Sequence, residues 1–257
     1  MANETENNTK TISRSEKTNA KNQENLHIAN SIVASVGDIF DPTNPIIDKD
    51  ALLEFETNFI ALTQAVLTAW IAEQAAVDAQ LMGFKPVSKR VSQIMKAVRA
   101  QGLDELFVDG LQADVYRLNA IRIDKKTPDT SPDPANSGEP APKNASVSRR
   151  SYAGILESLG IISEKLKNPV YNPNEPEFKS TAITAWVAGL QTTHNTALDK
   201  KVATRTARNT RNAYAYNDTD GLLPRMTALK NYLGYILDKD DPRLKQLKSL
   251  KFVDNTR

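Results

Sequence analysis

Apolar residues between Ala51 and Gln80 recur at steps of three and four, the spacing that predicts a helix with a buried face. This stripe consists of Leu52, Phe55, Phe59, Leu62, Val66 and Trp70. Four further apolar residues widen it: Leu53, Ile60, Leu67 and Ile71. The helix is therefore predicted to face more than one neighbour. It needs partner helices along its length, because isolated helices are only weakly stable in water.

The same spacing predicts shorter helices over residues 26–36, 87–98, 103–118, 152–166 and 222–236. A second long helix is predicted from near Glu175 towards Tyr214. Proline and glycine mark helix boundaries at Pro86, Gly102 and Gly221. The fold class predicted from this pattern is all-α.

A pentad on the first long helix returns on the second. Thr68-Ala69-Trp70-Ile71-Ala72 recurs as Thr184-Ala185-Trp186-Val187-Ala188, and the order of helices around it repeats as well. This order predicts a duplication. We expect two antiparallel helical bundles, residues 24–123 and 151–257, with a Pro-rich linker (residues 124–150) between them and a polar N-terminal arm (residues 1–23) before them.

The composition of the linker and the arm supports these boundaries. Residues 124–150 hold five of the thirteen prolines among Ser, Asp, Asn and Lys, which predicts an extended, solvated segment. Residues 1–23 are rich in Asn, Lys, Glu and Thr, with too little apolar surface to offset the entropy of ordering. The arm is interpreted either as a disordered tail or as a segment that docks on a neighbouring subunit.

Several short segments carry a family resemblance: Thr11-Ile12-Ser13-Arg14-Ser15-Glu16, Ala20-Lys21-Asn22, Phe84-Lys85-Pro86-Val87-Ser88-Lys89, Tyr171-Asn172-Pro173-Asn174-Glu175, Ala207-Arg208-Asn209, Gly221-Leu222, Lys245-Gln246-Leu247-Lys248 and Lys251-Phe252. Through them the chain resembles an uncharacterised family of two-repeat helical proteins found in Bacteroidota. The resemblance implies the repeated helical architecture and no established activity. It also marks the arm as patterned, so its candidate assembly residues are Thr11, Ile12, Ser13 and Arg14.

Composition excludes some classes of protein. The chain of 257 residues has a net charge of only +2, which argues against a surface built throughout for nucleic acid. Without cysteine it has no disulfide and no thiolate metal site. We expect no membrane span and no signal peptide, since no run approaches 18 apolar residues and the first residues are polar. The expected location is the cytoplasm, with export by a route that needs no signal peptide left open.

The sequence contains no recognisable catalytic constellation. Its two histidines, His27 and His194, have no second histidine nearby, and a lone imidazole gives a metal too few ligands. Glycine-rich phosphate loops and G-x-S-x-G turns are absent. We therefore predict no enzyme, no cofactor and no metal. An enzyme with a shallow site between the halves is an alternative hypothesis that the sequence supports less well.

One charged pattern has a definite shape. Lys201, Arg205 and Arg208 follow helical spacing on the second long helix, with Arg211 close beside them. This group is interpreted either as a solvated helix face with ion pairs or as a face for an anionic partner. Tyr214 and Tyr216 follow, but Gly221 assigns them to the helix end.

The function predicted from these observations is that of a non-enzymatic structural protein that self-associates into a homo-oligomer or larger assembly. The wide apolar faces of the long helices support it, because one bundle does not fully bury them. The alternative is a nucleic-acid-associated protein that uses the basic face. If the arm makes the contact, deletion of residues 1–23 should leave the bundles folded and abolish assembly.

Overall fold

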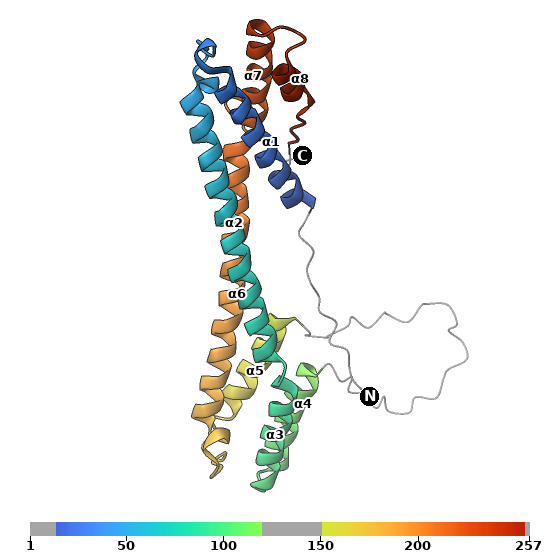
Figure 1. The fold of residues 1–257 in the computed structure, drawn as a ribbon. Coiled ribbons are helices and arrows are strands. Elements are labelled where there is room, and N and C mark those ends of the chain that lie inside the picture. The colour runs from blue at the N-terminus through green and yellow to red at the C-terminus, as the bar shows by residue number, and fades with distance from the viewer. Residues whose placement is uncertain (1–13, 120–150, 255–257) are drawn as a thin grey trace, which may run out of the picture. The chain divides into compact units, whose positions relative to one another are not determined.

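The computed structural model describes residues 14–119 and 151–254, and these fold into helices with no strand among them (Figure 1). The prediction of an all-α fold is therefore confirmed. The longer helices are α1 (Arg14–Val36), α2 (Lys49–Phe84), α3 (Val87–Ala100), α4 (Glu105–Leu118), α5 (Tyr152–Lys165), α6 (Ser180–Ala215), α7 (Leu222–Ile236) and α8 (Pro242–Ser249). Single 3₁₀ turns lie at η1 (Gly37–Ile39), η2 (Pro45–Ile47) and η3 (Pro176–Phe178).

Local chemistry explains several helix boundaries. Gly102 follows α3 with a φ of 63°, a left-handed conformation that favours glycine. Asp104 then caps α4, since its carboxylate accepts a hydrogen bond from the backbone N–H of Leu106 at 3.1 Å. Gly221 precedes α7 at a close approach of the backbone, where an added Cβ would lie 2.4 Å from the carbonyl oxygen of Asn217. These boundaries agree with the glycines that the sequence pattern singled out.

The N-terminal boundary of the fold differs from the prediction. α1 begins at Arg14, so residues 14–23 are helical and do not form a disordered arm; residues 1–13 lie outside the described residues. Asn19 and Asn22 on this helix are buried. The amide nitrogen of Asn22 donates to Tyr216 and Val253, and Oδ1 of Asn19 accepts from the hydroxyl of Tyr216, so these buried amides bond to residues far away in the sequence. Within residues 14–23, the polar composition therefore reflects asparagines that bond inside the first unit.

Contacts between described residues form two compact units. The first unit combines the residues up to Glu73 with those from Lys200 onward, and the second unit comprises Gln74 to Asp199. The first unit has a core drawn from α1, α2, α7 and α8, including Leu26, Val33, Phe55, Phe59, Leu222, Leu229, Leu233, Leu244 and Leu247. The core of the second unit includes Phe84, Val91, Ile94, Val98, Leu111, Val115, Leu159, Ile162, Leu166 and Ile183.

These units differ from the predicted bundles at residues 24–123 and 151–257. Each core combines helices from both halves of the sequence, because the long helices α2 and α6 each supply residues to both units. Hydrophobic periodicity shows which face of a helix is buried, but it does not show which helix covers that face. The duplication itself stays a prediction, and the predicted linker lies wholly outside the described residues.

Candidate functional site: an uncovered face of α2 and neighbouring surfaces

The first unit leaves one apolar face of α2 uncovered by the residues that the structure describes. Leu53, Ile60, Leu67 and Ile71 are exposed to 47%, 49%, 45% and 56%. The sequence singled out these four side chains as a widening of the helical stripe. Their exposure confirms that the first unit does not use the whole apolar surface of this helix. Contiguous exposed apolar surface is typical of an interaction site.

Helical geometry separates this face from the core. Leu52, Phe55, Phe59 and Val66 are buried. Thr57 and Gln64 lie between the exposed apolar residues and are exposed as well. Together Leu53, Thr57, Ile60, Gln64, Leu67 and Ile71 form one line along the helix, here called the α2 seam. Their alternating steps of four and three residues match the period of a helix that pairs with another helix.

From Thr57 onward the α2 seam runs through a stretch without charge. Residues 57–72 include no Asp, Glu, Lys or Arg. By length and composition, Lys49–Ala100 also contains an 18-residue window apolar enough to cross a membrane, with a mean hydropathy of 1.3, although no such helix was expected from the sequence. Only 11% of that window is buried. Length and composition alone do not distinguish a membrane helix from a helix of a soluble protein.

Buried contacts on the opposite side of α2 are those of a folded bundle. Phe55 stacks against Tyr214 with ring centroids 5.0 Å apart, and the guanidinium of Arg225 lies 4.7 Å from the centroid of the Phe55 ring. The buried carboxylate of Glu56 accepts a hydrogen bond from Asn30 at 2.7 Å. The aromatic contacts and the buried carboxylate fix this part of α2 in the core of the first unit.

The predicted basic face is divided between the surface and the interior. Lys201 and Arg205 are exposed on α6. Arg211 is fully buried, and its Nη1 lies 2.5 Å from Oε2 of Glu16 on α1. The Nε of Arg208 lies 3.5 Å from Oε1 of the same carboxylate. Two of the four cations therefore join α6 to α1, and the structure does not bring all four together on one open surface.

The predicted assembly arm has a different placement. Thr11, Ile12 and Ser13 lie outside the described residues, and Arg14 is the first residue of α1. Helix α1 itself carries a site that the sequence analysis missed. This site binds the extended segment Leu250–Val253 after α8, and we call it the asparagine clamp.

Side-chain amides of α1 bind the backbone of this segment. Asn22 donates to the carbonyl of Val253 at 2.8 Å and accepts from its N–H at 3.2 Å. Asn25 donates to the carbonyl of Lys251 at 2.7 Å, and Lys230 on α7 donates to that of Leu250, also at 2.7 Å. The clamp thus joins two ends of the described chain within the first unit. Asn22, Lys251 and Phe252 belong to the segments that carried the family resemblance, so this part of the pattern has a structural explanation.

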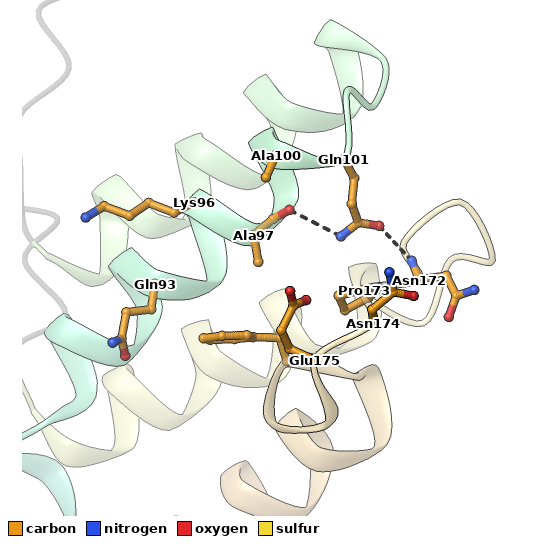
Figure 2. A pocket seen from close by; sticks show the side chains of 10 residues that line it. Gln93, Lys96, Ala97, Ala100, Gln101, Asn172, Pro173, Asn174 and Glu175 are labelled. Carbon is orange, nitrogen blue, oxygen red and sulfur yellow. Dashed lines mark hydrogen bonds between the residues drawn. The ribbon is translucent and has the colours of Figure 1, made fainter.

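The second unit contains an open pocket of about 500 Å³ between α3 and the turn before α6 (Figure 2). Small and apolar groups of Ala97, Ala100, Pro173 and Phe178 line it together with polar ones of Gln93, Lys96, Gln101, Asn172, Asn174 and Glu175. Gln101 joins its two sides, because its Oε1 accepts from the N–H of Asn172 at 2.9 Å and its Nε2 donates to the carbonyl of Ala97 at 3.2 Å. The lining offers polar groups but no pair of nucleophile and base.

Titratable groups near the pocket have structural roles. The hydroxyl of Tyr171 donates to the carbonyl of Phe178 at 2.7 Å. Burial raises the pKa of Tyr171 to about 12, and the negative charge of Glu175 acts in the same direction. This phenol is therefore a neutral donor that holds the turn.

The two histidines each have a partner. His27 pairs with Glu56 at 2.9 Å, and Nδ1 of His194 lies 2.6 Å from Nε2 of Gln80.

Within the described ranges no group of three or more His, Asp or Glu side chains is placed to hold a metal ion. Comparison of the chain with protein-family models, with curated proteins and with solved structures found no match. Function is therefore inferred from the contacts and exposed surfaces of the chain itself. Among these, the α2 seam is a line of exposed apolar residues along one helix that its own unit leaves without a packing partner in the part of the chain that the structure describes.

Proposed function

We propose that this protein is a non-enzymatic structural protein that self-associates through the α2 seam. The exposure of Leu53, Ile60, Leu67 and Ile71 along one uncharged line of a helix carries this proposal. Burial of apolar surface is the main favourable term in protein association. An uncharged seam can be covered without removing a charge from water, which would oppose binding.

The exposed area supports a weak, concentration-dependent association. Full burial of a Leu or Ile side chain contributes about 1.5–3 kcal/mol, so a half-exposed one contributes about 1 kcal/mol on being covered. Four such residues on each of two copies contribute about 8 kcal/mol. Association costs about 4–15 kcal/mol in lost freedom of motion. Even at the low end of that cost the net gain is about 4 kcal/mol, so the affinity of one such contact is expected to be about millimolar or weaker. Repeated contacts in an assembly add to each other.

The basic residues support the nucleic-acid alternative less well. Arg211 is inside the first unit, and Arg208 shares the carboxylate of Glu16 with it. Of the predicted group, Lys201 and Arg205 remain exposed, and Lys200 beside them on α6 is exposed as well. Three phosphate contacts give a shallow dependence of affinity on salt, whereas proteins built for DNA make about 6–10.

Substitution of the seam tests the proposal. We expect the double variant Ile60→Gln/Leu67→Gln to keep its helical circular dichroism and to dissociate at concentrations where the natural chain is associated. Loss of two half-exposed apolar side chains per copy, four per pair, weakens association by about 4 kcal/mol, or about a thousandfold. Leu198→Gln on α6 is the matched control, because Leu198 is exposed to 49%, as Ile60 is. Equal association of the natural chain and both variants in sedimentation velocity would show that the seam does not mediate self-association.

A further inference from the structure

We infer that the α2 seam pairs with the same seam of a second copy, with the two helices antiparallel and related by a two-fold axis near residue 62. This inference rests on the proposed self-association and adds the partner, the orientation and the register. A two-fold contact uses the same patch on both copies, so one seam is sufficient to form it.

The spacing of the seam fits helix pairing. Leu53, Thr57, Ile60, Gln64, Leu67 and Ile71 are separated by four, three, four, three and four residues, the pattern of the a and d positions of a heptad. The flanking positions at Ala61 and Thr68 are small. Small flanking side chains let a second helix approach the seam closely.

One antiparallel register places all four apolar residues opposite uncharged residues of the second copy. With the axis near residue 62, Leu53 lies opposite Ile71 of the second copy, Thr57 opposite Leu67, and Ile60 opposite Gln64. Every pair then joins an a position to a d position, and none includes a charged residue.

Neighbouring registers are worse for a definite reason. A shift of one heptad in one direction places Leu53 opposite Asp78, and a shift in the other direction places Leu67 opposite Asp50. Either shift covers an apolar side chain with a carboxylate, which loses its water without gaining a partner. The central register is therefore the one in which the seam is self-complementary.

The parallel orientation has a different defect. It places Asp50, an exposed residue at the a position before Thr57, directly opposite Asp50 of the second copy. Like charges across a helix pair repel each other, and parallel helix dipoles repel as well. In the antiparallel register Asp50 lies opposite Gln74, which is uncharged. Electrostatics thus selects the antiparallel pair.

A lipid surface fits the seam less well than a second copy does. Helices that lie in a membrane interface carry Lys and Arg beside the apolar face, where the lipid headgroups are. Residues 57–72 contain neither. A spanning helix would also have to leave the core of the first unit, where Phe55, Phe59 and Glu56 are buried.

Engineered cysteines test the register, because the natural chain has none. We would compare the double variant Leu53→Cys/Ile71→Cys with each single variant and with Ala65→Cys, an exposed position away from the seam. The two substituted positions of one chain are about 27 Å apart along the helix. A disulfide needs Cα atoms within about 7 Å, so the double variant can close its disulfides only between copies.

Under mild oxidation we expect the double variant to shift from 28.4 kDa to twice that mass on a non-reducing gel. Each single variant and Ala65→Cys should stay at the mass of one chain. Cross-linking of Leu53→Cys alone would overturn the antiparallel orientation in favour of a parallel pair. Absence of cross-linking in a protein that light scattering shows to be associated would overturn the register and leave the proposed function intact.

Two further outcomes concern self-association itself and the identity of the partner that covers the seam. A single-chain mass at every concentration would overturn the proposed self-association and the register together. Co-sedimentation of the natural chain with vesicles of phosphatidylcholine and phosphatidylglycerol, abolished by Ile60→Gln/Leu67→Gln, would overturn the second copy as the partner of the seam.

Discussion

Replacement of Arg211 by alanine is expected to destabilise the first unit strongly, although this residue belongs to an apparently basic stretch of α6. Its side chain is fully buried, with Nη1 at 2.5 Å from Glu16 and Nη2 at 3.1 Å from Oδ1 of Asn212. The substitution removes a cation from a buried ion pair with Glu16, to which Arg208 is a second, more distant basic neighbour at 3.5 Å. It also leaves a cavity where the long Arg side chain packed.

The magnitude follows from the burial of the pair. Breaking a buried ion pair by removing one partner costs about 3–5 kcal/mol. We expect about 3 kcal/mol here, because the Glu16 side chain is 20% exposed and Arg208 remains near it. Arg205→Ala is the matched control, since Arg205 is exposed on the same helix. Such a surface substitution changes stability by less than about 0.5 kcal/mol.

Urea denaturation followed by circular dichroism measures both variants. With a slope of about 2 kcal/mol per molar urea, the expected loss in Arg211→Ala lowers the midpoint by about 1.5 M. The double variant Glu16→Gln/Arg211→Met should recover part of the loss, because it removes both charges. A midpoint for Arg211→Ala that matches the Arg205→Ala control would refute the interior ion pair and restore Arg211 to the surface.

Three further predictions concern the ends of the described chain and the pocket. Deletion of residues 1–23 should lower the melting temperature, because it removes the first ten residues of α1; a melting temperature equal to that of the full chain would contradict the role of α1. Asn22→Ala should cost about 2–3 kcal/mol in urea and speed proteolysis after α8, with exposed Lys21→Ala as the control. Tyr171 should stabilise the fold fully below pH 10 and lose that contribution as pH rises towards 12, because its hydroxyl ionises at a lower pH in the unfolded chain than in the folded one. Tyr171→Phe should flatten this dependence of stability on alkaline pH. If stability falls with pH as steeply in the variant as in the natural chain, the raised pKa is wrong.

Hydrophobic periodicity predicted most of the helices correctly, because each has one buried stripe. α7 is the clearest case: Leu222, Met226, Leu229 and Leu233 follow steps of four, three and four, and all are buried. The same pattern on α2 also identified the side chains of the seam. Their exposure follows from a surplus of apolar surface over what one unit covers.

Two parts of the structure had no comparable signal in the sequence. The asparagines of α1 are polar and mediocre helix formers, so their composition favoured a solvated arm. Their partners, Val253 and Lys251, are more than 200 residues away, and no local spacing reveals such a bond. Arg211 lies in line with the buried residues Leu190, Ala197 and Thr204 at steps of seven. Because arginine is rarely interior without a partner, the sequence placed it on the surface.

The most direct test of self-association is the mass of the natural chain in solution, measured by light scattering on a sizing column over a range of loading concentrations. If the chain self-associates, its mass rises from 28.4 kDa towards twice that value or beyond as concentration increases. A constant mass of 28.4 kDa up to the highest concentration would contradict it.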